Sequence, residues 1–339
     1  MAQNSFTFGE GSIIQSRYES DQSALNFFSS KLPYHLFLKQ TGEGAYPHTH
    51  GGLSFWEFLN EPDNKENLEN FQAMFDDISR VMTPPLVKDF DWPALVGGNT
   101  ANPTIVDVGG GLGGVLALVL DTLPKARGIL FDQEKVIEQA RKQKRWGGTE
   151  VPLASAEGGV SAEIADLSER GTLVAGSFLE DEVPVGGDVY IMRMILHDWS
   201  DEESKKILHN VRRAMLKTHQ QASKGSSKTS NMPRLVVMET VLPEEGSGPS
   251  GQLPLSAEFV DVHMKLMFNG KERSESEFAA LFESAGFKYL GTTYTRGLYI
   301  FILSFFPPLL LLLSVIFLTI VIPSSPLGTF HIIQGEPLL

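Results

Sequence analysis

A glycine-rich turn after the apolar run Thr104–Val108 constrains the fold of this chain more than any other stretch. The run has the sequence TIVDV, and five glycines then occupy the six positions 109–114. Short runs rich in β-branched residues are typical of buried strands. Glycine is needed where a chain turns sharply or where a ligand approaches bare backbone. The apolar run 115–120 continues as a predicted helix, so the unit places backbone N–H groups at a helix N-terminus, where polar ligand groups bind.

A second apolar run, Gly128–Phe131, ends at Asp132, which stands 23 residues after Gly109. A nucleotide-binding βαβ unit places an acidic acceptor for ribose hydroxyls at about this distance. Gly109, Gly111 and Gly114 also fit the dinucleotide pattern G-x-G-x-x-G. A nicotinamide-dependent dehydrogenase therefore remains open at this point, as does a tight turn that binds no ligand.

Composition limits the kinds of partner and chemistry. The chain has 41 acidic and 28 basic residues, a formal net charge of −13, and no cysteine. Because a phosphate backbone requires a basic face, no nucleic-acid partner is expected. The lack of cysteine excludes disulfides, thiolate nucleophiles and cysteine-ligated metal sites, and no other residues have metal-site spacing, so no metal is predicted. The N-terminus shows no secretory signal pattern, and a cytoplasmic location is expected.

Strand-like and helix-like segments alternate along the chain. Apolar residues at three- and four-residue spacing predict helices over 53–87, 134–144, 207–215 and 259–268. Short apolar runs predict further strands at 173–176, 188–196, 235–239, 287–294 and 298–303. Ser200–Glu203 and Ser274–Glu277 have the pattern of capping boxes at helix N-termini. This alternation predicts a mostly parallel sheet with helices on both faces.

Polar side chains stand at the ends of four predicted strands: Asp107, Asp132, His197 and Glu239. The carboxyl ends of parallel strands meet at one edge of a sheet, where ligands bind, so we expect these side chains to converge. A histidine beside acids at such an edge is suited to accept a proton near neutral pH. A lone histidine is more often structural, and its place between a strand and the dipeptide Asp198–Trp199 favours the functional interpretation.

Five motifs occur in order along the chain. They are Asp107-x-Gly-Gly-Gly-x-Gly, Phe131-Asp132, His197-Asp198-Trp199-Ser200-Asp201, Glu239-Thr240-Val241-Leu242-Pro243 and Gly270-Lys271-Glu272-Arg273. Together, over residues 45–303, they resemble the S-adenosylmethionine-dependent small-molecule O-methyltransferases of the caffeate and acetylserotonin type. The resemblance implies a Rossmann-like α/β methyltransferase fold. Its sheet would be mostly parallel, doubly wound and seven-stranded, with an antiparallel last strand.

The resemblance implies that His197 is the general base that deprotonates a hydroxyl group of a small aromatic acceptor. Glu239 and Glu272 would flank and orient the imidazole. The resulting oxyanion would attack the sulfonium methyl group in line, so that base strength and positioning provide the catalysis. From the residues alone, both glutamates could instead be salt-bridge partners of Lys271 or Arg273.

The resemblance also assigns the cofactor and the acceptor. The glycine loop would hold the methionine part of S-adenosylmethionine, Asp132 the ribose hydroxyls and Gly176–Phe178 the adenine. The implied cofactor residues are Asp107, Gly109, Gly111, Asp132, Ser177, Phe178 and Arg193. The implied acceptor residues are Met74, Met194, Asp198 and Met264. Ser177 stands where the family usually has an acid, which predicts weaker adenine binding.

The chain departs from the family at its N-terminal end. The family normally begins with a winged-helix dimerisation domain of about a hundred residues, and there is no room for one before residue 45. We expect 1–95 to be a helical remnant of that region and 96–303 to be the methyltransferase domain. A homodimer is left open. A methyltransferase-like binding protein without catalysis is an alternative, whereas a dehydrogenase gives no role to Gly270–Arg273.

The tail 304–339 is expected to lie outside the catalytic domain and to contribute nothing to the site. Residues 298–322 contain no charged residue over 25 positions. If 298–303 forms the closing strand and Pro308 opens a helix, the apolar helix is shorter than the hydrocarbon core of a bilayer. Three interpretations remain open for 304–322: a short membrane anchor, an apolar surface helix, or a foreign segment from an imperfect gene model.

Overall fold

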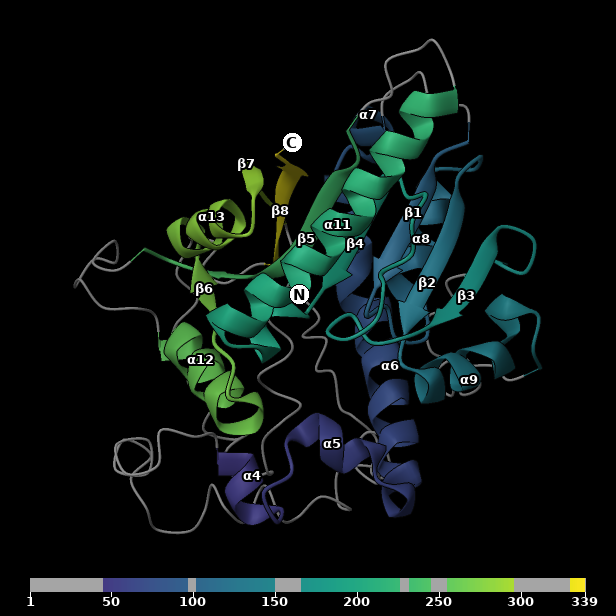
Figure 1. Ribbon diagram of the computed structural model, residues 1–339. Coiled ribbons are helices and arrows are strands. Elements are labelled where there is room, and N and C mark those ends of the chain that lie inside the picture. Colours follow the sequence, from purple (N-terminus) through teal and green to yellow (C-terminus); the bar gives the residue numbers. More distant parts are fainter. Residues whose placement is uncertain are drawn as a thin grey trace, which may run out of the picture.

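The computed structural model describes residues 45–96, 102–149, 166–225, 232–244, 255–295 and 330–338. In these residues a mixed sheet runs through the molecule with helices packed against it (Figure 1). The sheet is mostly parallel, with antiparallel pairing at its C-terminal strand. The predicted α/β class is therefore confirmed.

The sheet has eight strands, and seven of them follow the order β3-β2-β1-β4-β5-β8-β7. Their bounds are β1 Thr104–Val108, β2 Arg127–Asp132, β3 Gly171–Ala175, β4 Val189–Arg193, β5 Arg234–Leu242, β7 Phe287–Tyr294 and β8 Phe330–Pro337. The eighth, β6 (Arg273–Ser274), pairs with the end of β5. The chain order reverses between β1 and β4, so the carboxyl ends of these two strands flank a crevice where α/β proteins bind ligands.

Helices cover both faces of this sheet. Their bounds are α4 Ala45–Thr49, α5 Phe55–Asn60, α6 Lys65–Asp89, α7 Trp92–Val96, α8 Gly114–Thr122, α9 Glu134–Lys142, α11 Asp201–Gly225, α12 Leu255–Phe268 and α13 Glu275–Ser284. Single 3₁₀ turns are η1 Pro62–Asn64, η2 Lys144–Trp146 and η3 Leu196–Asp198. Both predicted capping boxes are present, and a third, at Ser54 and Glu57, was not foreseen.

Alternate residues along each strand enter two separate hydrophobic cores. Ile105 and Leu130 are fully buried in a core with α8, whereas Val106 and Tyr190 are fully buried in a core with α11 and α13. Burial on both faces explains why the strands are apolar without alternation. The glycine turn and the strand ends are thereby held between two packed layers.

The N-terminal helices belong to the same packed unit. The predicted helical region 53–87 forms α5 and α6, and α6 packs against α8 beside the glycine turn. Tyr46, Phe55 and Leu59 form a further apolar cluster with the first turns of α6, against which Phe268 of α12 packs. The N-terminal segment therefore adjoins the carboxyl edge of the sheet.

The strand that closes the sheet was predicted wrongly. The antiparallel partner of β7 is β8, from residues 330–337, and not the segment 298–303. β8 also pairs with β5, so it lies between two strands that the sequence order places before it. Residues 330–337 are therefore part of the main sheet and not of an outlying tail. Only Phe330, Ile332 and Ile333 are strongly apolar in this stretch, so its sequence carries a weak strand signal.

No helix within the described ranges is long and apolar enough to span a membrane. The apolar segment 304–322 lies outside these ranges, as does 298–303. A membrane contact through 304–322 therefore stays a prediction from the sequence.

The position of β8 predicts opposite outcomes for two deletions. Truncation after Leu303 removes the antiparallel partner of both β5 and β7. We therefore expect the truncated protein to lose the cooperative thermal unfolding transition, which circular dichroism measures. Replacing residues 296–329 with Asn-Gly keeps β8 and joins it to β7 by a short turn that suits antiparallel strands. This second variant is expected to unfold cooperatively. A truncated protein with the melting temperature of the full chain would contradict the β8 assignment.

Candidate active site

The turn after β1 has the backbone conformation that its glycines predict. Gly109 and Gly111 have φ angles of 72° and 59°, in the left-handed region that favours glycine. A Cβ atom on Gly109 would lie 2.5 Å from Cδ1 of Ile195, so no side chain fits there. The turn is thus a close junction between β1 and the segment that follows β4.

Two buried carboxyl groups lie beside this turn. Asp132 accepts hydrogen bonds from the backbone N–H groups of Gly111 and Gln133 at 2.8 and 2.7 Å. Burial raises the pKa of Asp132 to about 6, although these two hydrogen bonds oppose the rise. Burial and the nearby Asp132 raise the pKa of Asp107 to about 7. Oδ2 of Asp107 has no hydrogen-bond partner among the described residues.

His197 is held in a cluster of acids beyond the end of β4. Its Nδ1 lies 2.9 Å from Oε1 of Glu272 and 3.7 Å from Oε2 of Glu239, and its Nε2 lies 3.5 Å from Oδ1 of Asp198. The side chains of His197, Glu239 and Glu272 expose 6%, 0% and 1% of their surface. The structure therefore brings together the three residues for which the sequence predicted catalysis, and Nδ1 is positioned to donate to Glu272.

Backbone contacts fix both glutamates. Oε1 of Glu239 accepts from the N–H groups of Ile195 and Leu196 at 2.9 and 2.8 Å, so β5 directly anchors the turn that carries His197. The backbone N–H of Glu272 donates to Oδ1 of Asp261 on α12 at 2.9 Å. Asp261 is a support that the sequence patterns did not indicate.

The salt-bridge alternative for the glutamates does not match the structure. Lys271 pairs with Glu277 at 2.7 Å and with Asp201 at 3.6 Å. Arg273 pairs with Asp201 at 2.8 Å and donates to the carbonyl of Leu196 at 2.7 Å. The two basic residues therefore brace the turn around His197, and Glu239 and Glu272 are left to the imidazole.

The acids change the proton affinity of His197. Burial lowers the pKa of the imidazole, but the negative charges of Glu239, Asp198 and Glu272 outweigh burial and raise it to about 10. Burial raises the pKa of Asp198 to about 7, against the attraction of His197. Burial also raises the pKa of Glu239. His197 is thus a stronger base than an ordinary histidine.

Arg193 connects the glycine turn to this cluster. It is buried, and its Nη1 donates to Oγ of Ser79 on α6 at 2.8 Å. Burial lowers its pKa to about 10, while the charges of Glu239 and Asp107 oppose that fall. Arg193 therefore balances acidic charge from both parts of the site.

Ser177, in the segment after β3, stands where the resemblance predicts an acidic residue. The N–H of Ser177 donates to Oδ2 of Asp181 at 2.8 Å, and its hydroxyl accepts from the N–H of Leu179 at 3.2 Å. Phe178 packs edge-on against Trp199 and lies beside Gly109. Asp181, four residues after Ser177, thus places a carboxylate directly beside Ser177.

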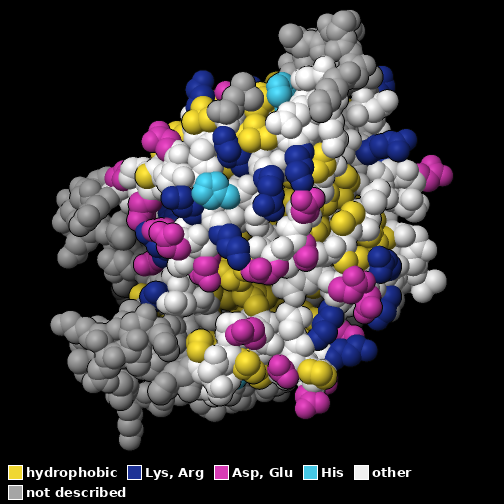
Figure 2. Space-filling model, in the orientation of Figure 1, with side chains coloured by type: hydrophobic (Ala, Val, Ile, Leu, Met, Phe, Trp, Pro, Cys, Tyr) yellow, Lys and Arg dark blue, Asp and Glu magenta, His cyan; other side chains and the backbone are white. Residues whose placement is uncertain are grey.

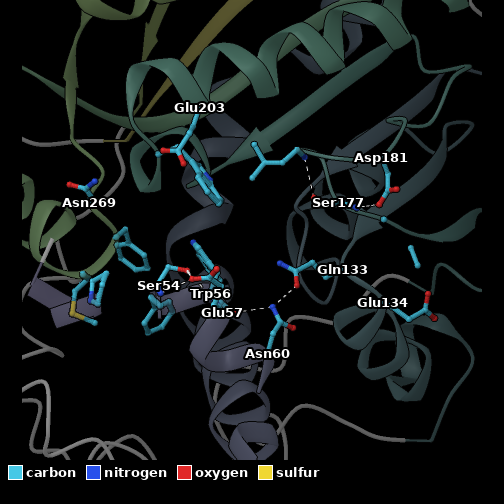
Figure 3. Close-up of a pocket in the computed structure, with 18 residues that line it drawn as sticks. Ser54, Trp56, Glu57, Asn60, Gln133, Glu134, Ser177, Asp181, Glu203 and Asn269 are labelled. Carbon is cyan, nitrogen blue, oxygen red and sulfur yellow. Dashed lines mark hydrogen bonds between the residues drawn. The ribbon is translucent and has the colours of Figure 1, made fainter. Parts of the chain in front are cut away.

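A cavity of about 860 Å³ opens beside the carboxyl ends of β2 and β3 (Figure 3). Across it, Asn60 of α5 donates to Oε1 of Gln133 at 2.7 Å, which ties α5 to the start of α9. Four of the lining residues are acidic, and the described lining contains no Lys, Arg or His. The lining is Pro47, Ser54, Phe55, Trp56, Glu57, Asn60, Gln133, Glu134, Ala175, Gly176, Ser177, Leu179, Asp181, Trp199, Glu203, Met267, Phe268 and Asn269.

The predicted acceptor residues lie away from that lining. Met194, Asp198 and Met264 are buried, with 8%, 6% and 4% of their surface exposed, and none of them lines the cavity. Met194 has a φ of 53°, a strained value for a side chain of its size. Met74 lies on α6, but its side chain is outside the described part of the structure.

Several lining residues were not foreseen from the sequence. Gln133 directly follows the predicted ribose acid, so its position was a usable signal, but nothing marked Asn60 or Trp56. Within the described ranges, no group of three or more His, Asp or Glu side chains could hold a metal ion.

Comparisons with known proteins bear on the family and the fold of the chain. Residues 35–288 match the sequence profile of the O-methyltransferase domain family. The phenazine O-methyltransferase PhzM of Lysobacter antibioticus is 32% identical over 73% of this chain and 58% of its own length. The 3-amino-4-hydroxybenzoate 4-O-methyltransferase of Streptomyces cremeus is 33% identical over 74% of this chain and 55% of its own. The chain thus spans a little over half the length of these curated relatives.

Solved structures share the fold. The crystal structure of LaPhzM has a TM-score of 0.60 and 27% identity, covering 96% of this chain and 70% of that one. The O-methyltransferase NcsB1 from neocarzinostatin biosynthesis, solved with S-adenosylmethionine and 2-hydroxy-5-methyl naphthoic acid, has a TM-score of 0.60 and 22% identity. It covers 96% of this chain and 72% of its own.

Removing one charge of the cluster should change the titration of His197. Glu239→Gln keeps an oxygen for the two backbone N–H groups but loses the negative charge, which is the largest contribution that raises the pKa of His197. We expect the pKa to fall from about 10 toward the ordinary value of about 6.5. The measurement is the NMR titration of the imidazole. Glu203→Gln, at an exposed capping box, is the control, and an equal fall in both variants would contradict the assignment.

Proposed function

The chain belongs to the O-methyltransferase family, and we propose that it transfers a methyl group from S-adenosylmethionine to a hydroxyl group of a small aromatic acceptor. The observation that carries the proposal is His197, buried at the carboxyl edge of the sheet with Glu272 and Glu239 against Nδ1. The same edge carries the glycine turn and Asp132. A nicotinamide-dependent dehydrogenase gives this cluster no role.

The residues around the glycine turn fit the cofactor. Gly109 and Gly111 have the positive φ angles that form the tight turn before α8, and Asp132 would accept hydrogen bonds from the ribose hydroxyls. Ser177 and Gln133 line the cavity, which supports placing the adenine end there, beside Phe178. When bound, S-adenosylmethionine supplies an electrophilic methyl group on its sulfonium sulfur. Asp107 and Arg193, one acidic and one basic, would be the buried charged side chains near this part of the cofactor.

His197 would accept the proton of the acceptor. With Nδ1 hydrogen-bonded to Glu272, Nε2 is the nitrogen left for a hydroxyl group. A phenol has a pKa of about 10, close to the pKa of about 10 of His197, so the proton can pass without a large energetic penalty. An aliphatic alcohol is far less acidic and would not match. By raising the strength of the base, the acids bring phenolic acceptors within its range.

The surroundings support a small, flat acceptor. Phe55, Trp56 and Phe268 face one another beside the cavity, with ring centroids 5.0–5.7 Å apart. On the face in Figure 2, Lys and Arg side chains are interspersed with Asp and Glu, which supports a small-molecule partner over a nucleic acid. We propose Met194, Asp198 and Met264 as buried walls on the acceptor side, and Met74 as a fourth from the sequence.

Loss of the base should remove chemistry and spare binding. His197→Gln keeps a polar side chain of similar length but has no basic nitrogen that could accept the proton. We expect methyl transfer to a phenol to fall by about a hundred-fold to ten-thousand-fold, the usual contribution of a general base. Binding of S-adenosylhomocysteine, followed by calorimetry, should stay within about two-fold, since the imidazole faces the acceptor. Unchanged turnover would refute the role of His197. Wild-type protein that binds but never transfers would indicate a non-catalytic binding protein.

Cofactor affinity should depend on the ionisation of Asp132. The ionised carboxylate is the better acceptor for two hydroxyls, and its pKa of about 6 means that it becomes protonated as the pH falls through 6. S-adenosylhomocysteine should therefore bind about ten-fold more weakly at pH 5 than at pH 8. Asp132→Asn should bind weakly at both values and lose this pH dependence. A variant that retains the wild-type pH dependence would show that another group is responsible.

A further inference from the structure

A glutamine of the N-terminal segment lies over the glycine turn. Gln72, on α6, exposes only 8% of its surface. Its Oε1 lies 3.2 Å from the position that a Cβ atom on Gly111 would occupy, and within the described part of the chain it is the one non-neighbouring atom found within 4 Å of that position. The side chain therefore stands directly above the backbone that the family uses for the methionine part of the cofactor.

The carboxamide of Gln72 makes no hydrogen bond with any other described residue. Buried polar groups are nearly always hydrogen-bonded, and each exception requires an explanation such as an absent ligand. Oδ2 of Asp107 is such an exception, because it is buried at the same turn and has no hydrogen-bond partner among the described residues. The turn thus has a buried oxygen of Asp107 without a described partner beside Gly110 and the amide oxygen of Gln72 beside Gly111.

The surface of α6 that carries Gln72 is a polar stripe facing the site. Ser79 and Thr83 follow at seven and eleven residues, which is close to two and three helical turns, so all three share one face. Ser79 accepts from Arg193, and Thr83 is fully buried. A helix packed only for burial would carry apolar residues at these positions. The stripe indicates that α6 contributes to the site and does not merely cover it.

We infer that Gln72 binds the amino-acid end of S-adenosylmethionine, an inference that rests on the proposed function. Asp132 would hold the ribose beside Gly111, whose N–H it accepts, and Gln72, which lies beside the same glycine, would then be within reach of the methionine part. That end is a zwitterion with a carboxylate and an ammonium group. A carboxamide matches both, since its NH₂ group donates to the carboxylate and its oxygen accepts from the ammonium. The N-terminal segment therefore supplies a cofactor-binding residue, and 96–303 alone is an incomplete site.

A pair of ligands that differ at this end tests the inference. S-adenosylhomocysteine has the amino-acid end, whereas 5′-methylthioadenosine has the same adenosine and sulfur without it. Both are titrated by calorimetry into the wild-type full chain and into Gln72→Leu, which keeps the volume and removes the amide. We expect S-adenosylhomocysteine to bind about ten-fold or more weakly to the variant, because hydrogen bonds to charged groups are lost. Binding of 5′-methylthioadenosine should change by less than about two-fold.

Control variants separate this role from a structural one. Gln143→Leu removes another buried glutamine amide that lines neither the turn nor the cavity, and it should leave both affinities unchanged. If Gln72→Leu does not fold, Gln72→Asn replaces it, since the shortened amide should also weaken S-adenosylhomocysteine selectively. Equal weakening of both ligands, or of neither, overturns the inference. Wild-type protein that binds 5′-methylthioadenosine and S-adenosylhomocysteine equally overturns it too, while failure to bind either ligand refutes the proposed function itself.

Discussion

The contact on which the site depends is the buried carboxylate of Glu239. It accepts hydrogen bonds from the N–H groups of Ile195 and Leu196 and faces the imidazole of His197. One side chain therefore both fixes the turn and raises the pKa of the base. It reaches this position because β4 and β5 pair in parallel, with Arg193 opposite Met238. A register shift of one residue would turn Glu239 to the other face of the sheet. Sheet pairing and proton affinity are therefore coupled here.

The strand that secures this pairing comes from the far end of the chain. β8 lies between β5 and β7, and its His331 is opposite Glu239. Tyr294 and His331, between which residues 295–330 run, are thus opposite each other near the carboxyl edge of β5. Whatever that segment does, its two ends leave from the side of the sheet that carries the candidate site.

Sequence patterns predicted the parts of the fold that depend on local chemistry. The glycine turn, the strand ends at Asp132 and His197, and two capping boxes follow from residue types at fixed spacing. The pairing of β8 does not, because an antiparallel strand added after a long insertion has no local signal that names its partner. Gln72 was missed for a similar reason. A single glutamine in an amphipathic helix looks like a surface residue until the tertiary packing buries it.

The most direct test of the account is the pH dependence of kcat/KM for methyl transfer to a phenol whose own pKa is about 10. Turnover requires the neutral imidazole and the neutral phenol. With the pKa of His197 raised to about 10 by its acids, kcat/KM should keep rising through pH 7 and 8 to a maximum near pH 10, above which ionisation of the free phenol lowers it. A plateau that begins near pH 6.5, the value of an ordinary histidine, would contradict the claim that the buried acids set the strength of the base.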